Sequence, residues 1–181
     1  MAIHQIQVRY EATADRLLLQ LRTTQAEVYA VWLTRRMLQR LYPPFRQAVA
    51  QASVASATPQ ALPVPEARQM LEHAALQQTL RGADFAQPFA IADATHPLGL
   101  DPLLPDAADL RPGAAGQLTL AVREPRGRRI EIALNAELAG ALLRLLDSAL
   151  VVAEWGLPAL VPDGGASAAE PAGAEPGRLL S

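Results

Sequence analysis

Two stretches of this chain, residues 15–49 and 116–150, carry the same apolar pattern at a constant spacing of 101 positions. In each stretch, apolar residues alternate with polar ones over two short runs that a turn separates. The apolar period then lengthens to 3.6 after a polar residue, Thr34 in one stretch and Asn135 in the other. Alternation indicates half-buried strands, and the longer period indicates an amphipathic helix with the polar residue as its N-cap. Each stretch therefore predicts a β-hairpin that leads directly into a helix.

A third strand is expected before each hairpin. Residues 3–11 alternate Ile6, Val8 and Tyr10 with polar side chains, which is typical of a half-buried strand. Before the second hairpin, residues 88–93 and 102–105 are both short and flanked by proline, and either could be the edge strand. The predicted fold class is α+β: a tandem, pseudo-twofold duplication of a β-β-β-α unit, with each antiparallel hairpin beneath the helix that follows it.

Composition divides the rest of the chain. Residues 1–50 form the first predicted unit, and residues 51–83 form a linker with a connecting helix over 65–82. Residues 84–155 form the second unit, packed with the first as one domain. The Pro-, Gly- and Ala-rich residues 156–181 are predicted to be a disordered tail.

The two predicted helices differ at one point. Pro43 and Pro44 fall inside the first helix, where the second has Arg144 and Leu145. Because proline removes a helical hydrogen bond and clashes with the preceding turn, we expect the first helix to break or bend near Tyr42.

Several chemistries lack their usual sequence signals. The chain has no cysteine, and His4, His73 and His96 are scattered without metal-ligand spacing. Motifs for a phosphate-binding loop or an activated serine are missing, so we expect no enzyme activity, no cofactor and no metal. No apolar run is free enough of charge to span a membrane, and the first residues do not resemble a secretory signal. These features favour a cytoplasmic protein, and the exclusive use of arginine over lysine is typical of a GC-rich genome.

The charge is unevenly distributed although its total is −2. Residues 1–50 hold seven arginines against three acidic residues, a net charge of +4, and residues 51–112 hold three arginines against seven acidic residues, a net charge of −4. We expect the basic and acidic parts to face each other, within one chain or between two. The negative total argues against a general nucleic-acid binder.

Arg35 and Arg36 follow the N-cap Thr34, where the helix dipole is already positive and acidic residues are preferred. The second stretch has Ala136 and Glu137 at these positions, so the fold does not require arginine there. The two arginines could pair with acidic residues of the chain, such as Glu11, Asp15 or those of residues 93–109. Alternatively, they could bind an anion such as a phosphate or a partner's carboxylate.

The outward faces of the predicted strands extend this basic surface. The residues we single out as a possible anion- or partner-binding set are Arg9, Arg22, Trp32, Arg35, Arg36 and Arg123. We expect a non-enzymatic interaction module whose basic N-terminal surface binds a protein partner or a second copy. The alternative is binding of single-stranded nucleic acid by stacking and phosphate contacts. In architecture alone, the tandem arrangement resembles the duplicated nucleic-acid binders of the Whirly and PUR-repeat type. The two functions differ in whether the acidic residues 84–112 cover these arginines.

Overall fold

The computed structural model describes residues 2–57, 89–90, 92–125 and 127–157. Two three-stranded antiparallel sheets and two long helices make up the described part, so the predicted α+β class is confirmed. The elements of the first half are β1 (Ile3–Glu11), the short 3-10 helix η1 (Ala12–Ala14), β2 (Arg16–Thr23), β3 (Val28–Thr34) and α1 (Arg35–Ala57). Those of the second half are β4 (Ala107–Pro112), η2 (Ala114–Gly116), β5 (Leu118–Arg123), β6 (Arg129–Leu134) and α3 (Ala136–Ala153).

Both hairpins and both helix starts are confirmed. Leu17 lies opposite Leu33 in the first hairpin, and Leu118 lies opposite Leu134 in the second, so equivalent cross-strand pairs are 101 positions apart. The Thr34 hydroxyl accepts a hydrogen bond from the N–H of Met37 at 3.3 Å, and the Asn135 side chain accepts one from Leu138 at 2.8 Å. Each polar side chain thus caps the helix that follows its hairpin.

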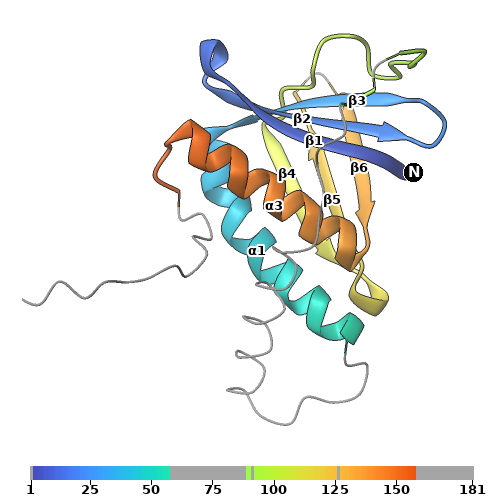
Figure 1. Ribbon diagram of the computed structural model, residues 1–181, viewed down its shortest axis with the longest axis vertical. Coiled ribbons are helices and arrows are strands. Elements are labelled where there is room, and N and C mark those ends of the chain that lie inside the picture. Colours follow the sequence, from blue (N-terminus) through green and yellow to red (C-terminus); the bar gives the residue numbers. More distant parts are fainter. Residues whose placement is uncertain (1, 58–88, 91, 126, 158–181) are drawn as a thin grey trace, which may run out of the picture.

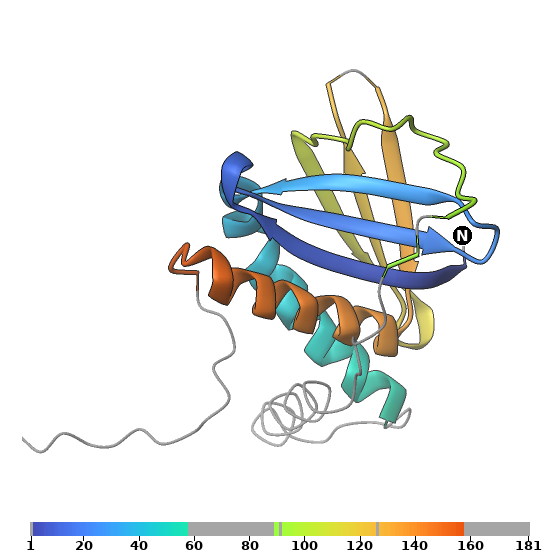
Figure 2. The same ribbon diagram turned by 45° about the horizontal axis from the view of Figure 1, so that its top comes forward.

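The two sheets cross one over the other, and the two helices lie against them on one side (Figures 1 and 2). The inward face of each sheet carries the predicted alternating apolar residues, and these side chains form one continuous core with both helices. The largest fully buried side chains include Tyr42 and Phe45 of α1, Leu19 of β2, Ile132 of β6 and Leu142 of α3. Burial of these faces in a common core is the main force that holds the two halves together.

The helices do not cover their own hairpins, and this part of the prediction is wrong. Figure 2 shows α3 beside β1, the first strand of the other half, and α1 packs beside β4 and η2. Tyr42 of α1 donates a hydrogen bond to the buried carboxylate of Asp147 in α3, which joins the two helices. Each helix therefore packs mainly beside strands of the other half.

The first strand of the second half was also wrongly placed. It is β4, which lies after both of the proposed segments. Leu103, inside the proposed strand 102–105, instead forms a parallel bridge with Val31 at the edge of the first sheet. The described part of 88–93 contains no strand. The misplacement has a clear cause: β4 offers only Ala108 and Leu110 as inward apolar residues, which is a weak alternating signal.

The prolines do not break α1, which continues through Pro43 and Pro44 to Ala57. Of the two expected outcomes, a break or a bend near Tyr42, the break is wrong, and the first residues of the predicted linker, 51–57, are helical. The carbonyls that lose a partner belong to Gln39 and Arg40, and both residues are exposed, so solvent can satisfy those carbonyls. The buried side chains that flank the prolines hold the helix against the core in spite of the missing hydrogen bonds.

Two further predictions concern residues outside the described part of the chain. The connecting helix over 65–82 lies wholly outside it, and the tail 156–181 lies outside it except for Gly156 and Leu157.

Candidate binding site at the edge of β4

The four outer strands of the two sheets differ in what lies beside them. The edge of β3 is paired with the irregular segment that precedes β4: Val28 N–H donates to the Thr95 carbonyl, and Trp32 N–H donates to the Leu103 carbonyl, both at 2.8 Å. The edge of β1 has α3 packed beside it. The edge of β3 is therefore covered by a strand-like segment. β1 and β4 each have a helix packed beside them, and at β4 two hollows separate the strand from that helix.

The outer edge of β4 presents backbone groups that point away from its own sheet. Gly113 N–H donates to the Gln117 carbonyl at 2.7 Å, which is one rung of the ladder between β4 and β5. Rungs recur at every second residue of an antiparallel pair. The next rungs therefore fall at Arg111 and Asp109, and the N–H and carbonyl groups of Ala108 and Leu110 face outward. Within the described residues, no other backbone group bonds to these two.

Both ends of this open edge are defined. Asp106 N–H donates to the Arg123 carbonyl at 3.0 Å, although Ala107 is the register partner of Arg123. Two residues thus oppose one, which is a β-bulge that bends the chain at the start of β4. At the other end, Pro112 offers a carbonyl but no N–H. A strand that pairs with this edge can do so only between the bulge and the proline.

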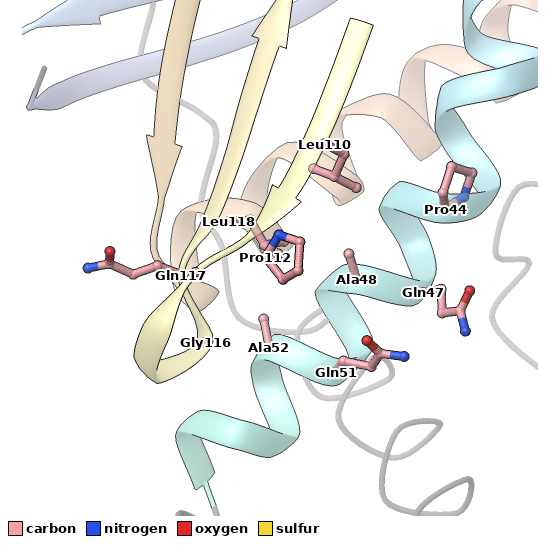
Figure 3. A pocket seen from close by; sticks show the side chains of 11 residues that line it. Pro44, Gln47, Ala48, Gln51, Ala52, Leu110, Pro112, Gly116, Gln117 and Leu118 are labelled. Atoms are coloured by element: carbon pink, nitrogen blue, oxygen red, sulfur yellow. The ribbon is translucent and has the colours of Figure 1, made fainter.

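Two adjoining hollows lie between β4 and α1. The smaller one is about 370 Å³ and is largely apolar (Figure 3). In it, Leu110 and Pro112 of the β4 side face Ala48 and Ala52 of α1. The hollow exists because alanine side chains are too small to fill the space between helix and strand. Gln47 and Gln51 line its outer side.

The larger hollow, about 740 Å³, is charged. Arg36 and Arg40 of α1 lie on one wall, and Asp106 and Asp109 lie on the other. The two arginines are four residues apart, so they share one face of the helix. Arg40 was not among the predicted site residues, although its spacing from Arg36 could have indicated it. The two hollows share Pro44 and Leu110, and together they form one groove along the β4 edge.

The structure separates Arg35 from Arg36. Arg36 lines the groove, whereas Arg35 lies near Asp15, and its positive charge contributes to a lowered pKa of that carboxyl. The largest cause of the lowered pKa is a hydrogen bond from the Trp155 indole, at 2.7 Å, and the next is one from the Tyr10 hydroxyl, at 2.9 Å. Asp15 was one of the predicted acidic neighbours. Arg35 therefore belongs to a structural cluster, and Arg36 belongs to the groove.

Arg9, Arg22 and Trp32 lie on the outward face of the first sheet, as predicted. In one cross-strand row, Leu18 lies between Arg9 and Trp32, and it is only 5% exposed beside these large neighbours. Arg9 pairs with Glu11 at 2.8 Å. On the predicted stacking surface, Trp32 is thus half-buried and Arg9 is engaged in an ion pair.

The segment that leads to β4 crosses near the other end of this face. Arg22 donates to the Ala92 carbonyl at 3.5 Å, and Gln5 accepts from the Ala90 N–H at 3.2 Å. These contacts involve the backbone of the acidic segment and not its carboxylates. The segment thus partly covers Arg22, and within the described residues none of its carboxylates forms an ion pair with this arginine.

Arg123 lies apart from the other predicted residues. It is exposed on the outward face of the second sheet, opposite Arg129. The nearby hairpin tip is partly neutralised, because Arg128 bonds to the buried carboxylate of Glu124 at 3.0 Å, which raises the pKa of Arg128. Arg128 also donates to the Leu98 carbonyl at 2.9 Å. The six predicted residues thus fall at four separate places: the outward face of the first sheet, the Asp15 cluster, the groove and the outward face of the second sheet.

Comparisons with protein-family models, with curated proteins and with solved structures found no match. In the ranges that the structure describes, no helix is long and apolar enough to cross a membrane. Nor do three or more histidine or acidic side chains gather there at metal-binding distance.

Proposed function

We propose that this protein is a non-catalytic interaction module that binds a polypeptide strand, from a protein partner or a second copy, at the open edge of β4. The observation that carries this proposal is the row of outward backbone groups of Ala108 and Leu110 beside a groove. Strand addition to a sheet edge supplies affinity through main-chain hydrogen bonds, and pockets for alternate side chains supply specificity.

The groove supports a division of the bound strand into two parts. The apolar end, around Ala48 and Ala52, suits small or aliphatic side chains. The charged end offers Arg36 and Arg40 to a carboxylate of the strand. In this proposal, the arginine pair that looked misplaced at the start of α1 has two roles. Arg35 supports the fold near Asp15, and Arg36 faces the ligand.

We also propose that the two β-β-β-α halves are a tandem, pseudo-twofold duplication. The matching cross-strand pairs at a spacing of 101 residues and the equivalent N-caps Thr34 and Asn135 support this interpretation. The two halves differ at their first strands, and this difference supports a specialised role for β4. Arg16 lies opposite Glu11, whereas the equivalent Gln117 bonds to Gly113, so the turn that follows β4 is one residue shorter than the turn that follows β1, and the first strands are offset by 102 positions.

The strand-binding proposal is tested with a phage-displayed library of random ten-residue peptides, panned against the full chain and two proline variants. Ala108→Pro removes an N–H that faces the open edge and leaves the rungs to β5 in place. Ala133→Pro is the matched control. Ala133 lies on β6, the opposite edge strand of the same sheet, and its N–H also faces away from β5.

We expect peptides that bind the unmodified chain and Ala133→Pro but bind Ala108→Pro at least about tenfold more weakly, since the edge loses one of its two outward donors. A library from which nothing is enriched, or peptides that bind all three proteins equally, would refute the proposal. A parallel titration with a labelled single-stranded oligonucleotide covers the alternative. Micromolar binding that weakens steeply with salt and depends on Arg9 and Arg22 would replace strand binding with nucleic-acid binding.

A further inference from the structure

This inference rests on the proposed function and names the occupant of the edge. We infer that the strand that pairs with β4 is β4 of a second copy, antiparallel and centred on Leu110. The two sheets that contain β4 would then join across a twofold axis into one six-stranded sheet. The evidence is that the short open edge is complementary to itself in both hydrogen bonding and charge.

The hydrogen bonding satisfies every outward donor of the edge. In the register centred on Leu110, the N–H of each Leu110 donates to the carbonyl of the other Leu110. Ala108 lies opposite Pro112 of the second copy, so its N–H donates to the Pro112 carbonyl. Pro112 contributes a carbonyl acceptor, and it has no N–H that would need a partner. The residue that would weaken most strand pairings is thus tolerated in this one.

The charges select this register over its neighbours. Asp109 and Arg111 are both exposed and lie on the same face of β4. With Leu110 at the centre, Asp109 of each copy lies opposite Arg111 of the other, which gives two opposite-charge pairs across the twofold axis. Two neighbouring registers also pair the outward backbone groups of both strands. They place Asp109 opposite Asp109, or Arg111 opposite Arg111. Opposite charges stabilise directly facing cross-strand positions, and like charges destabilise them.

The surroundings of β4 also favour an occupant there. The groove beside it leaves space between β4 and α1, and in this proposal the second strand enters there. At β6, the Arg128 side chain holds the carbonyls of Leu98 and Asp101, and this segment lies beside the start of that strand. β4 spans only Ala107–Pro112, so the interface between the two copies is expected to bury less than about 1,200 Å² of surface. We therefore expect association in the micromolar range.

The test is analytical ultracentrifugation of the full chain over a range of concentrations, at low and high salt. The unmodified chain is expected to form a concentration-dependent dimer that weakens with salt. Asp109→Arg and Arg111→Asp each replace both opposite-charge pairs with like-charge pairs, and each is expected to weaken the dimer about tenfold or more. The double variant Asp109→Arg/Arg111→Asp restores opposite charges and is expected to restore the dimer. Ala108→Pro is expected to abolish the dimer, and Ala133→Pro is expected to leave it unchanged.

Three results would overturn the inference: a chain that stays monomeric at every concentration, a dimer that survives both single charge reversals, and a dimer that responds to Ala133→Pro but not to Ala108→Pro. The peptide library separates this inference from the proposed function. A monomeric chain that still selects peptides in an Ala108-dependent way retains the strand-binding edge and refutes only the second copy as its occupant. A monomeric chain that selects no peptide refutes both.

Discussion

The close approach of the η2 turn to α1 gives the sharpest prediction for stability. Gly116 has a φ of +74°, and a Cβ built on it would lie 2.7 Å from the carbonyl oxygen of Ala52 in α1. Because that oxygen belongs to the helix backbone, it cannot move aside as a flexible side chain would. A Gly116→Ala variant therefore meets two separate costs: an unfavourable backbone conformation and a collision with α1.

The two costs can be estimated separately. A left-handed conformation costs a residue with a Cβ about 1–2 kcal/mol. Overpacking against a rigid neighbour costs about 1–3 kcal/mol more. We therefore expect Gly116→Ala to lower the free energy of unfolding by about 2–5 kcal/mol. In a chain of this size, each kcal/mol lowers Tm by about 2–4 °C. The measurement is urea denaturation followed by far-UV circular dichroism, with thermal melts alongside.

Gly127 provides the matched control. Its φ is +87°, but a Cβ built on it would meet nothing within 4 Å. Gly127→Ala therefore carries only the conformational cost, about 1–2 kcal/mol. If Gly116→Ala destabilises the protein no more than Gly127→Ala does, the reasoning is refuted, and η2 does not lie against Ala52. The same contact closes one end of the groove, so a larger loss at Gly116 also supports the shape of the proposed site.

Two further predictions concern the contacts between the halves. Tyr42→Phe removes the donor to the buried carboxylate of Asp147, and we expect a loss of about 1–3 kcal/mol in urea denaturation. Tyr29→Phe, which removes a 3.3 Å bond to the Glu27 side chain in a more exposed setting, is the control with a smaller expected effect, and equal losses would contradict the argument. The folded-state pKa of Asp15 lies below its unfolded value, so its contribution to stability is present above about pH 4 and is lost as the pH falls through the lowered folded pKa. The stability advantage of the unmodified chain over Asp15→Asn should therefore fade in acid, and an advantage that stays constant down to pH 2 would show that Asp15 is not held as described.

The local elements were predictable from the sequence because their signals are local. Alternation in β2, β3, β5 and β6 depends on one buried face per strand, and the N-caps Thr34 and Asn135 depend on side chains within one turn of the helix start. Long-range burial overrode one local interpretation. Pro43 and Pro44 indicate a break, but the buried neighbours Tyr42 and Phe45 hold α1 continuous against the core.

The candidate site was only partly predictable. Arg36 was selected for its unusual position, and the structure places it in the groove. The acidic residues on the opposite wall of that groove, Asp106 and Asp109, lie some 70 residues further along the chain, and no local spacing in the sequence places them there. Whether a strand edge is open depends on which segment happens to lie beside it. The parallel pairing of Thr95 and Leu103 with β3 closes one edge, and no local pattern predicts that pairing.

The two hairpin-to-helix stretches and the positions of their helix caps can be predicted from the order of residues alone, since each follows from side-chain periodicity and hydrogen bonding within a few residues. The choice of which helix packs beside which sheet arises from the packing of the whole chain. The same packing also decides that β4 begins at Ala107 and that its outer edge faces a groove. These features depend on how two crossing sheets share one core. The packing of apolar surfaces is non-directional, so it leaves little trace in the order of residues along the chain.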